Sequence, residues 1–244
     1  MSKPLKYAAK VSPVREVSLY GSADLSFWKT KIDDPRLSPT EVDGKAQMLV
    51  ATADAKFFGI RFREISFSLM VNFAQDGNTY TGGYLIQAFN SVGPFAFVER
   101  AFFSTPYLSG RVEVETAMPF SVLLEKKGAT LFHAQFGGTE REPLKEGEDG
   151  WKGPVFLPQH SSQKTKPRRW FYADVHGATK VYPFVKEQDK TTIQPFADAE
   201  IFQWLIDSQF EATQWFVREA ASHAKSKTYQ VTELAERLSG IETN

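Results

Sequence analysis

Short segments in which apolar and polar side chains alternate limit most strongly what this chain can fold into. Between residues 47 and 136, segments rich in β-branched and aromatic residues are separated by turn signals such as Asp76-Gly77-Asn78 and Lys127-Gly128. Val112 and Val114, for example, alternate with charged neighbours, which is typical of half-buried antiparallel strands. The succession predicts a mainly β domain, a barrel or a sandwich. The predicted strands cover residues 48–52, 57–62, 65–73, 80–89, 110–116, 119–125 and 129–136.

The N-terminal and middle parts of the chain carry other patterns. Residues 1–15 are expected to form a loose leader, and Asp24 is expected to cap a short helix over residues 25–31. Residues 137–169 are charged and rich in Gly, Pro and Lys, so we expect a long loop with one short strand at 154–157. Further strands are predicted at 170–175 and 180–185, as a hairpin around Gly177, and at 191–196.

The C-terminal part is predicted to be helical over residues 198–240. Asp198 suits an N-cap, and apolar residues from Phe202 to Ala221 recur every three to four positions. A second short helix is expected over 232–238, before Gly240. We therefore expect one domain over residues 1–244, with its β part at 16–197.

Composition narrows the classes of function. The chain has 244 residues, 42% of them hydrophobic, with a formal net charge of zero and no cysteine. Neutral charge argues against nucleic-acid binding, and the lack of cysteine excludes disulfides and thiolate-bound metals. The four histidines lack metal-ligand spacing, so no metal and no cofactor are expected. Without a signal peptide or a long apolar stretch, a cytoplasmic protein with no membrane partner is expected.

Two motifs resemble those of the acetoacetate decarboxylases. Residues 99–108, Glu-Arg-Ala-Phe-Phe-Ser-Thr-Pro-Tyr-Leu, resemble a signature in which an arginine leads into an aromatic-Pro-Lys-Lys run. Residues 59–64, Gly-Ile-Arg-Phe-Arg-Glu, resemble the Gly-x-aromatic-x-Glu strand of that family. The resemblance extends weakly over about residues 15–200. It implies an α+β, mainly β fold: a closed, cone-like antiparallel β-barrel with flanking helices, a C-terminal helix and a narrow apolar pocket.

The chain differs from the family at the two lysine positions that carry the family's catalytic chemistry. In the decarboxylases the first lysine of the signature forms a Schiff base and the second lowers its pKa. Tyr107 and Leu108 stand at these two positions. Because a phenol cannot form an iminium with a ketone, Schiff-base decarboxylation by the usual route is not expected. The sequence is also similar to broader relatives of the family that carry Pro-Tyr instead of Pro-Lys.

Glu64 and Tyr107 are the candidate catalytic residues. Glu64 matches the family's motif and could be a pocket carboxylate with a raised pKa that acts as a general acid or base. The alternative interpretation is that Glu64 forms an ion pair with Arg61 or Arg63 at a strand edge. Tyr107 could donate a hydrogen bond to a ligand carbonyl, or fill the core in place of the lysine.

Four further residues are candidates for substrate binding. Arg61 and Arg63 could bind a carboxylate through bidentate geometry, with one of them facing solvent. Gln87, predicted to share a strand face with Leu85 and Phe89, could contact a ligand. Arg100 is the fourth candidate for substrate binding. The alternative interpretation is that Arg100 forms a structural salt bridge near Glu99.

Three functions remain open at this level. The first is the binding of a small-molecule partner, a carbonyl or carboxylate compound, in a pocket. If the protein is an enzyme, it would transform this compound by lyase-like acid–base chemistry. The second is a non-catalytic binding or interaction module. The third is nucleic-acid binding through the basic segment 164–170, which the neutral net charge disfavours. A homo-oligomer is compatible with each of them.

Overall fold

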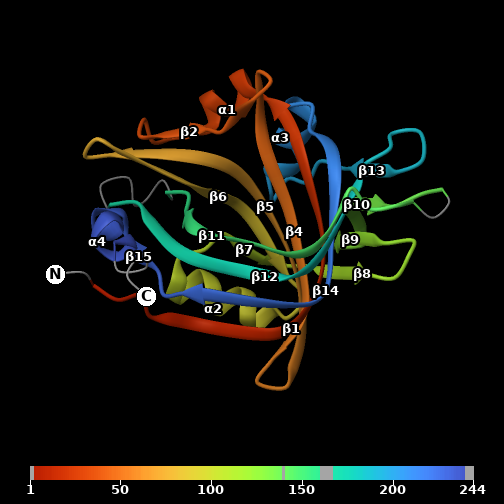
Figure 1. Cartoon of the computed structure of the whole chain (residues 1–244), viewed down its shortest axis with the longest axis horizontal. Helices are drawn as coiled ribbons and strands as arrows, with labels where there is room; N and C mark the ends of the chain where they lie inside the picture. The colour runs from red at the N-terminus through yellow and green to blue at the C-terminus, as the bar shows by residue number, and fades with distance from the viewer. Residues whose placement is uncertain (1–2, 139–140, 160–166, 240–244) are drawn as a thin grey trace.

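The computed structural model describes residues 3–138, 141–159 and 167–239. Two sheets dominate it, one of eleven strands and one of four (Figure 1). The large sheet comprises β1 (Tyr7–Asp24), β2 (Leu37–Pro39), β3 (Glu41–Val42), β4 (Lys45–Phe57), β5 (Ile60–Gln75), β6 (Asn78–Asn90), β7 (Tyr107–Ser109), β11 (Lys145–Phe156), β12 (Arg169–Pro183), β14 (Glu211–Ser226) and β15 (Tyr229–Gln230). The small sheet comprises β8 (Arg111–Glu115), β9 (Ser121–Lys126), β10 (Ala129–Gln135) and β13 (Lys190–Ile193).

The long strands of the large sheet are paired in a ring. Their order is β5–β4–β1–β14–β12–β11–β6, and β6 pairs back with β5. Most neighbours are antiparallel, whereas β6 pairs in parallel with both β11 and β7. The α+β, mainly β class is therefore confirmed, while a closed, cone-like barrel stays a prediction. The helices are α1 (Leu25–Lys31), α2 (Gly93–Phe103), α3 (Ile201–Asp207), the 3-10 turn η2 (Val231–Glu233) and α4 (Leu234–Leu238).

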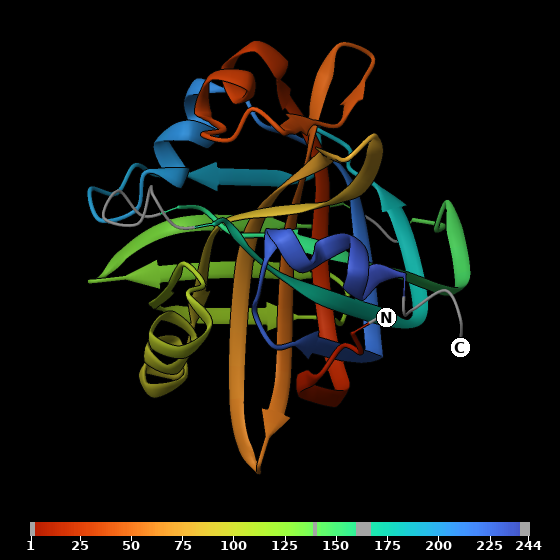
Figure 2. The same cartoon turned by 90° about the vertical axis from the view of Figure 1, so that its left-hand side faces the viewer.

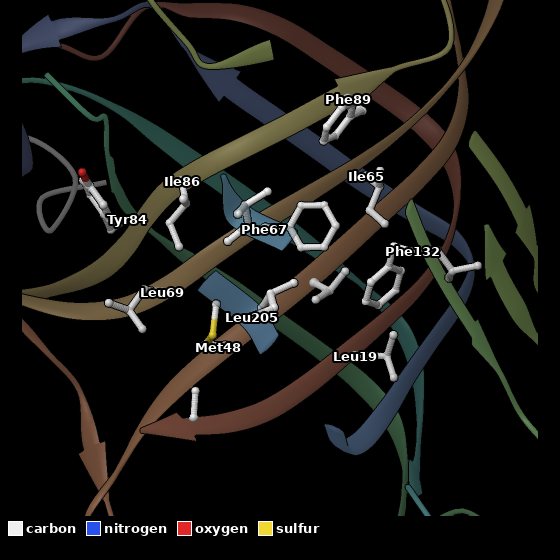
Figure 3. Close-up of a cluster of buried hydrophobic side chains, with 14 of the residues drawn as sticks. Leu19, Met48, Ile65, Phe67, Leu69, Tyr84, Ile86, Phe89, Phe132 and Leu205 are labelled. Carbon is white, nitrogen blue, oxygen red and sulfur yellow. The ribbon is translucent and has the colours of Figure 1, made fainter. Parts of the chain in front are cut away.

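One face of the large sheet carries the main hydrophobic core. Ile65, Phe67 and Leu69, at alternate positions of β5, are fully buried in it (Figure 3). The Phe67 ring meets Phe132 of β10 at 5.4 Å and Phe202 of α3 at 5.5 Å between centroids, both edge to face. Edge-to-face pairs add about 0.5–1.5 kcal/mol beyond the area they bury. The small sheet and α3 are thus fixed to this face by aromatic packing.

The predicted helix after Asp24 is confirmed. Asp24 is its N-cap, and the carboxylate Oδ1 accepts a hydrogen bond of 2.6 Å from the backbone N–H of Phe27. Trp28 is buried and packs edge to face on Trp204 of α3, with centroids 6.1 Å apart. As a result α1 and α3 lie together at one end of the molecule (Figures 1 and 2).

Three boundaries expected in the β part are wrong. The expected leader belongs largely to β1, which begins at Tyr7 and pairs with β14. The expected strand 57–62 is a hairpin turn, because Phe58 and Gly59 both take positive φ, 47° and 81°, between β4 and β5. Residues 169–183 form one strand, β12, with no turn at Gly177, because β11 and β14 pair along both of its edges.

The loop expected over residues 137–169 and the long C-terminal helix also need correction. The loop region contains all of β11, twelve residues that pair with β12, so the expected strand at 154–157 is only its end. The C-terminal helix ends at Asp207, and β14 follows. Trp215 and Val217 alternate in burial, and pairing with β1 and β12 outweighs the helical spacing of the apolar residues. The expected helix at 232–238 is confirmed as η2 and α4.

No helix within the described ranges is long and apolar enough to cross a membrane.

Candidate functional site

The face of the large sheet opposite the main core carries buried and partly buried polar residues. Glu64 of β5 is paired with Ala53 of β4 and Asn90 of β6, and it points away from the core that contains its neighbour Ile65. We call the residues gathered on this face the polar cluster. They are Glu16 of β1, Glu64 of β5, Glu99 of α2, Tyr107 of β7, and His223 and Lys225 of β14.

Glu64 and Tyr107 are brought together by the end of α2. The helix stops at Ser104, which is left-handed with φ 58°, and the chain then enters β7 beside Ala88 of β6. The Tyr107 hydroxyl donates a hydrogen bond of 3.2 Å to Oε2 of Glu64. Tyr107 is 7% exposed and packs in a second apolar cluster. The other members of that cluster are Leu85, Ala88, Ala96, Val155, Leu157 and Phe171.

This setting changes the proton affinity of both groups. Burial raises the pKa of Glu64 above its usual value, and the nearby carboxylate of Glu99 raises it further. The charges of Lys225 and His223 and the hydrogen bond from Tyr107 act in the opposite direction without cancelling the rise. Burial, followed by the charge of Glu64, raises the pKa of Tyr107 well above 10. Tyr107 is therefore a neutral hydrogen-bond donor, and Glu64 retains its proton to higher pH than an exposed glutamate.

Lys225 closes the cluster on the side of α2. Its Nζ forms an ion pair with Oε2 of Glu99, and both side chains are about one-fifth exposed, 19% and 22%. The Thr105 hydroxyl donates to the same Glu99 oxygen at 2.7 Å. The ammonium also lies over the rings of Phe171, Phe103 and Tyr107, at 4.7, 5.1 and 5.7 Å from their centres.

His223, two residues before Lys225, interacts with Glu16. Nε2 of His223 lies 3.1 Å from Oε2 of Glu16, and NH1 of Arg218 lies 3.0 Å from each Glu16 oxygen. Ser18 donates a further hydrogen bond of 2.9 Å. Burial raises the pKa of Glu16, but the hydrogen bond and charge of His223, with Arg218 and Ser18, lower it overall. Glu16 is therefore an ionised buried carboxylate.

The two arginines expected beside Glu64 lie elsewhere. Nε and NH2 of Arg61 lie 2.8 and 2.5 Å from the two oxygens of Asp54, and Nε of Arg63 lies 3.2 Å from Oδ2. Asp54 is buried, and although burial raises its pKa, these arginines lower it overall. Because side chains alternate along β5, Arg61 and Arg63 lie on the opposite face from Glu64. The strand-edge ion pair considered for Glu64 is thus made by Asp54.

Gln87 and Arg100 do not join the cluster either. Nε2 of Gln87 donates to the carbonyl of Pro106, so this amide holds the backbone beside Tyr107. A β-bulge shifts the register of β6 next to Gln87, and Leu85 and Phe89 consequently enter different cores, against the expected shared face. Arg100 lies exposed in the last turn of α2.

Sequence reasoning missed four of the six members of the cluster. Glu16 fell at the start of the β part and was given no role, and Glu99 was assigned to a local salt bridge. His223 and Lys225 lie in the C-terminal part predicted to be helical, which is in fact the strand β14 at these positions. Their i, i+2 spacing on one strand face is the signal that would have found them.

The described residues form no metal site at the cluster. Over residues 3–138, 141–159 and 167–239, no group of three His, Asp or Glu side chains is arranged to hold a metal ion. A small cavity lies elsewhere, lined among others by Ser104, Leu157, Arg168 and Arg169. A pocket around Glu64 therefore stays a prediction. Residues 164–166 of the basic segment lie outside the described residues, and Arg168 is buried in ion pairs with Asp33 and Asp34.

Solved structures share this fold at low sequence identity. Acetoacetate decarboxylase from Legionella pneumophila superposes with a TM-score of 0.63 at 13% identity, over 93% of this chain and 89% of that chain. The enduracididine biosynthesis enzyme MppR, complexed with pyruvate, gives 0.61 at 12% identity over 94% and 91%. An acetoacetate decarboxylase-like enzyme from Sphingomonas wittichii RW1 gives 0.58 at 11% identity over 91% and 92%.

Sequence comparison alone does not detect this relationship. No protein-family model matches the chain, and no curated protein matches it. The resemblance carried by residues 59–64 and 99–108 is nevertheless confirmed at the level of structure. The chain therefore has the fold of the acetoacetate decarboxylases, at 11–13% sequence identity to the three structures.

Proposed function

We propose that the chain binds a small carbonyl or carboxylate compound beside Glu64 and Tyr107 and transforms it by acid–base chemistry. The observation that carries this proposal is the raised pKa of Glu64 in contact with the Tyr107 hydroxyl. A carboxyl group whose pKa is raised keeps its proton to higher pH, and the protonated form can donate to a ligand carbonyl, as a general acid does. Perturbed carboxyl groups also cluster at functional sites. MppR, which has the same fold, is complexed with pyruvate in its solved structure.

The charges around Glu64 suit a ligand with an anionic end. The charges of Lys225 and His223 act on Glu64, and Lys225 is only partly buried. A carboxylate on the ligand would compete with Glu99 for the ammonium of Lys225. The carbonyl of the same ligand would then face Glu64 and Tyr107. Arg61, Arg63 and Arg100 have no part in this scheme.

A non-catalytic module is the second candidate. The tight packing of Tyr107 among Leu85, Ala88 and Phe171 favours it, because a filled apolar cluster leaves its ligand less room. The two candidate functions differ in whether the Glu64 carboxyl group transfers a proton to the ligand. A homo-oligomer stays a prediction under both.

Ligand-detected NMR with pyruvate and acetoacetate tests the proposal. We expect saturation transfer to a keto acid with wild-type protein, and at least tenfold weaker binding or turnover with Glu64→Gln. Arg61→Ala is the matched control, because it changes a charge three residues away on the opposite face, and it should bind as the wild type does. Binding of neither compound by folded wild-type protein would favour the module. Equal loss in both variants would contradict the assignment of the site.

A further inference from the structure

The pair Glu16–His223 is placed for proton transfer in the same site. His223 and Lys225 lie two residues apart and therefore share one face of β14, and Val11 and Ala9 of β1 pair with them. Lys225 reaches Tyr107, whose hydroxyl binds Glu64. Lys225 and Tyr107 therefore connect the strand face that carries His223 to the carboxyl group of Glu64. The His223 side chain is 23% exposed and is thus accessible to a small molecule.

Glu16 fixes which nitrogen of His223 carries the proton. An ionised carboxylate can only accept a hydrogen bond, so Nε2 of His223, 3.1 Å from Oε2 of Glu16, must carry the hydrogen. Arg218 and Ser18 keep Glu16 ionised and fixed in position. Within the described part of the chain, Nδ1 of His223 makes no hydrogen bond. With Nε2 donating to Glu16, Nδ1 is the ring nitrogen whose lone pair can act as a base when the imidazole is neutral.

We propose that His223, oriented by Glu16, is the base of this site and removes a proton from the carbon next to the carbonyl of the bound ligand. The inference rests on the proposed function and names its reaction class, enolisation. Nδ1 of His223 takes the proton, and the electron pair of the broken C–H bond forms the C=C bond of an enol. The carbonyl oxygen takes the proton of Glu64. Glu64 becomes a carboxylate and His223 an imidazolium, and the reverse transfers restore both.

The polar cluster contains an acid, Glu64, and a base, His223, on two different strands. Glu64 is an acid because burial and Glu99 favour its neutral form. His223 is a base because Glu16 accepts the hydrogen of its other nitrogen. Acid and base come from different strands, β5 and β14, so a ligand between them can be polarised from one side and deprotonated from the other.

Hydrogen–deuterium exchange of the pyruvate methyl group in D₂O, followed by ¹H NMR, tests the inference. We expect wild-type protein to speed the exchange above buffer, and His223→Asn to lower the rate about 100-fold or more, the usual range for losing a general base. The dissociation constant of pyruvate should change by less than about threefold, because the base is not the main binding group. His176→Asn is the matched control, since the His176 side chain is 61% exposed and forms an ion pair with Asp174, away from Glu64 and Tyr107 in the polar cluster as defined above. It should exchange at the wild-type rate.

A second variant tests the orienting role of Glu16 with a spectroscopic readout. In Glu16→Gln the side-chain amide can donate to Nε2 and so move the imidazole proton to Nδ1. We expect the ¹⁵N shifts of His223 to report this tautomer and the exchange to be lost. If Glu16→Gln does not fold, the wild-type ¹⁵N shifts decide alone: a hydrogen on Nε2 supports the inference and a hydrogen on Nδ1 overturns it.

The outcomes separate the two proposals. Pyruvate that binds to wild type but exchanges equally fast with His223→Asn overturns the inference and leaves the proposed binding function standing. Pyruvate that does not bind to folded wild-type protein overturns the proposed function, and the enolisation with it.

Discussion

The ammonium of Lys225 lies 5.7 Å from the centre of the Tyr107 ring, so a lysine from β14 covers the residue that stands where the resembled signature has its Schiff-base lysine. The site therefore still contains an amine, that of Lys225. It comes from the other end of the chain and is ion-paired with Glu99. An amine that is protonated in an ion pair has no lone pair with which to add to a carbonyl.

We predict that Lys225 forms no Schiff base. Intact-mass analysis after borohydride treatment with acetoacetate or pyruvate should show no reduced adduct on the folded wild-type protein. Glu99→Gln removes the paired carboxylate, and any adduct that appears only in this variant would confirm that the ion pair suppresses the amine. An adduct on Lys225 in the wild type would contradict the prediction and assign the chemistry to an amine.

Tyr107→Phe should raise the pKa of Glu64 further. The hydroxyl donates its hydrogen bond to the carboxyl group and so favours the ionised form, and the phenylalanine ring removes only that contribution. The measurement is a ¹³C NMR titration of the Glu64 side-chain carboxyl. Tyr20→Phe, on a partly buried tyrosine of β1 that contacts Phe216, is the control and should leave this titration unchanged. A lower pKa in Tyr107→Phe would show that the hydroxyl does not stabilise the carboxylate.

Glu64→Gln should make the protein more stable at pH 8 than the wild type, and equally stable near pH 4.5. The folded-state pKa of Glu64 lies above its unfolded value of 4.5, so its favourable contribution is present below that pH and is lost as pH rises through the folded pKa. Each unit of pKa difference corresponds to about 1.4 kcal/mol. Thermal unfolding across this pH range measures the gap between the two proteins. A gap that widens toward low pH would refute the raised pKa.

Arg218→Met should lower the free energy of unfolding by about 3–5 kcal/mol at pH 7, because it leaves the carboxylate of Glu16 buried without its charged partner. The pKa of Glu16 is lowered in the folded state, so the contribution of this ion pair is present above pH 4.5 and is lost as pH falls through the folded pKa. The difference between variant and wild type should therefore shrink in acid. Urea unfolding at several pH values measures it.

Arg111→Met provides the control for that experiment. Arg111 forms ion pairs with Glu113 and Glu125 but is 65% exposed, so solvent screening leaves these pairs little effect on stability. If Arg111→Met were as destabilising as Arg218→Met, the effect of Arg218 could not be attributed to burial of Glu16.

Local signals in the sequence determined the parts of this protein that depend on near neighbours. Alternation predicted most of the strands between residues 47 and 136, though not the turn at Phe58 and Gly59, and Asp24 predicted the start of α1, because side-chain period and capping act over a few residues. The motif at residues 99–108 led to the fold, and the pair Glu64 and Tyr107 was named from sequence and lies in hydrogen-bond contact.

Only the tertiary structure decided the rest of the site. Apolar spacing between Phe202 and Ala221 suited a helix, yet pairing with β1 and β12 makes β14 a strand and carries His223 and Lys225 to the polar cluster. Asp54, on the strand beside Arg61 and Arg63, holds both arginines on the opposite face from Glu64. Which strands pair, and which charges then meet, depends on contacts between residues far apart in the chain, such as Glu16 and His223, and such contacts leave no local pattern in the sequence.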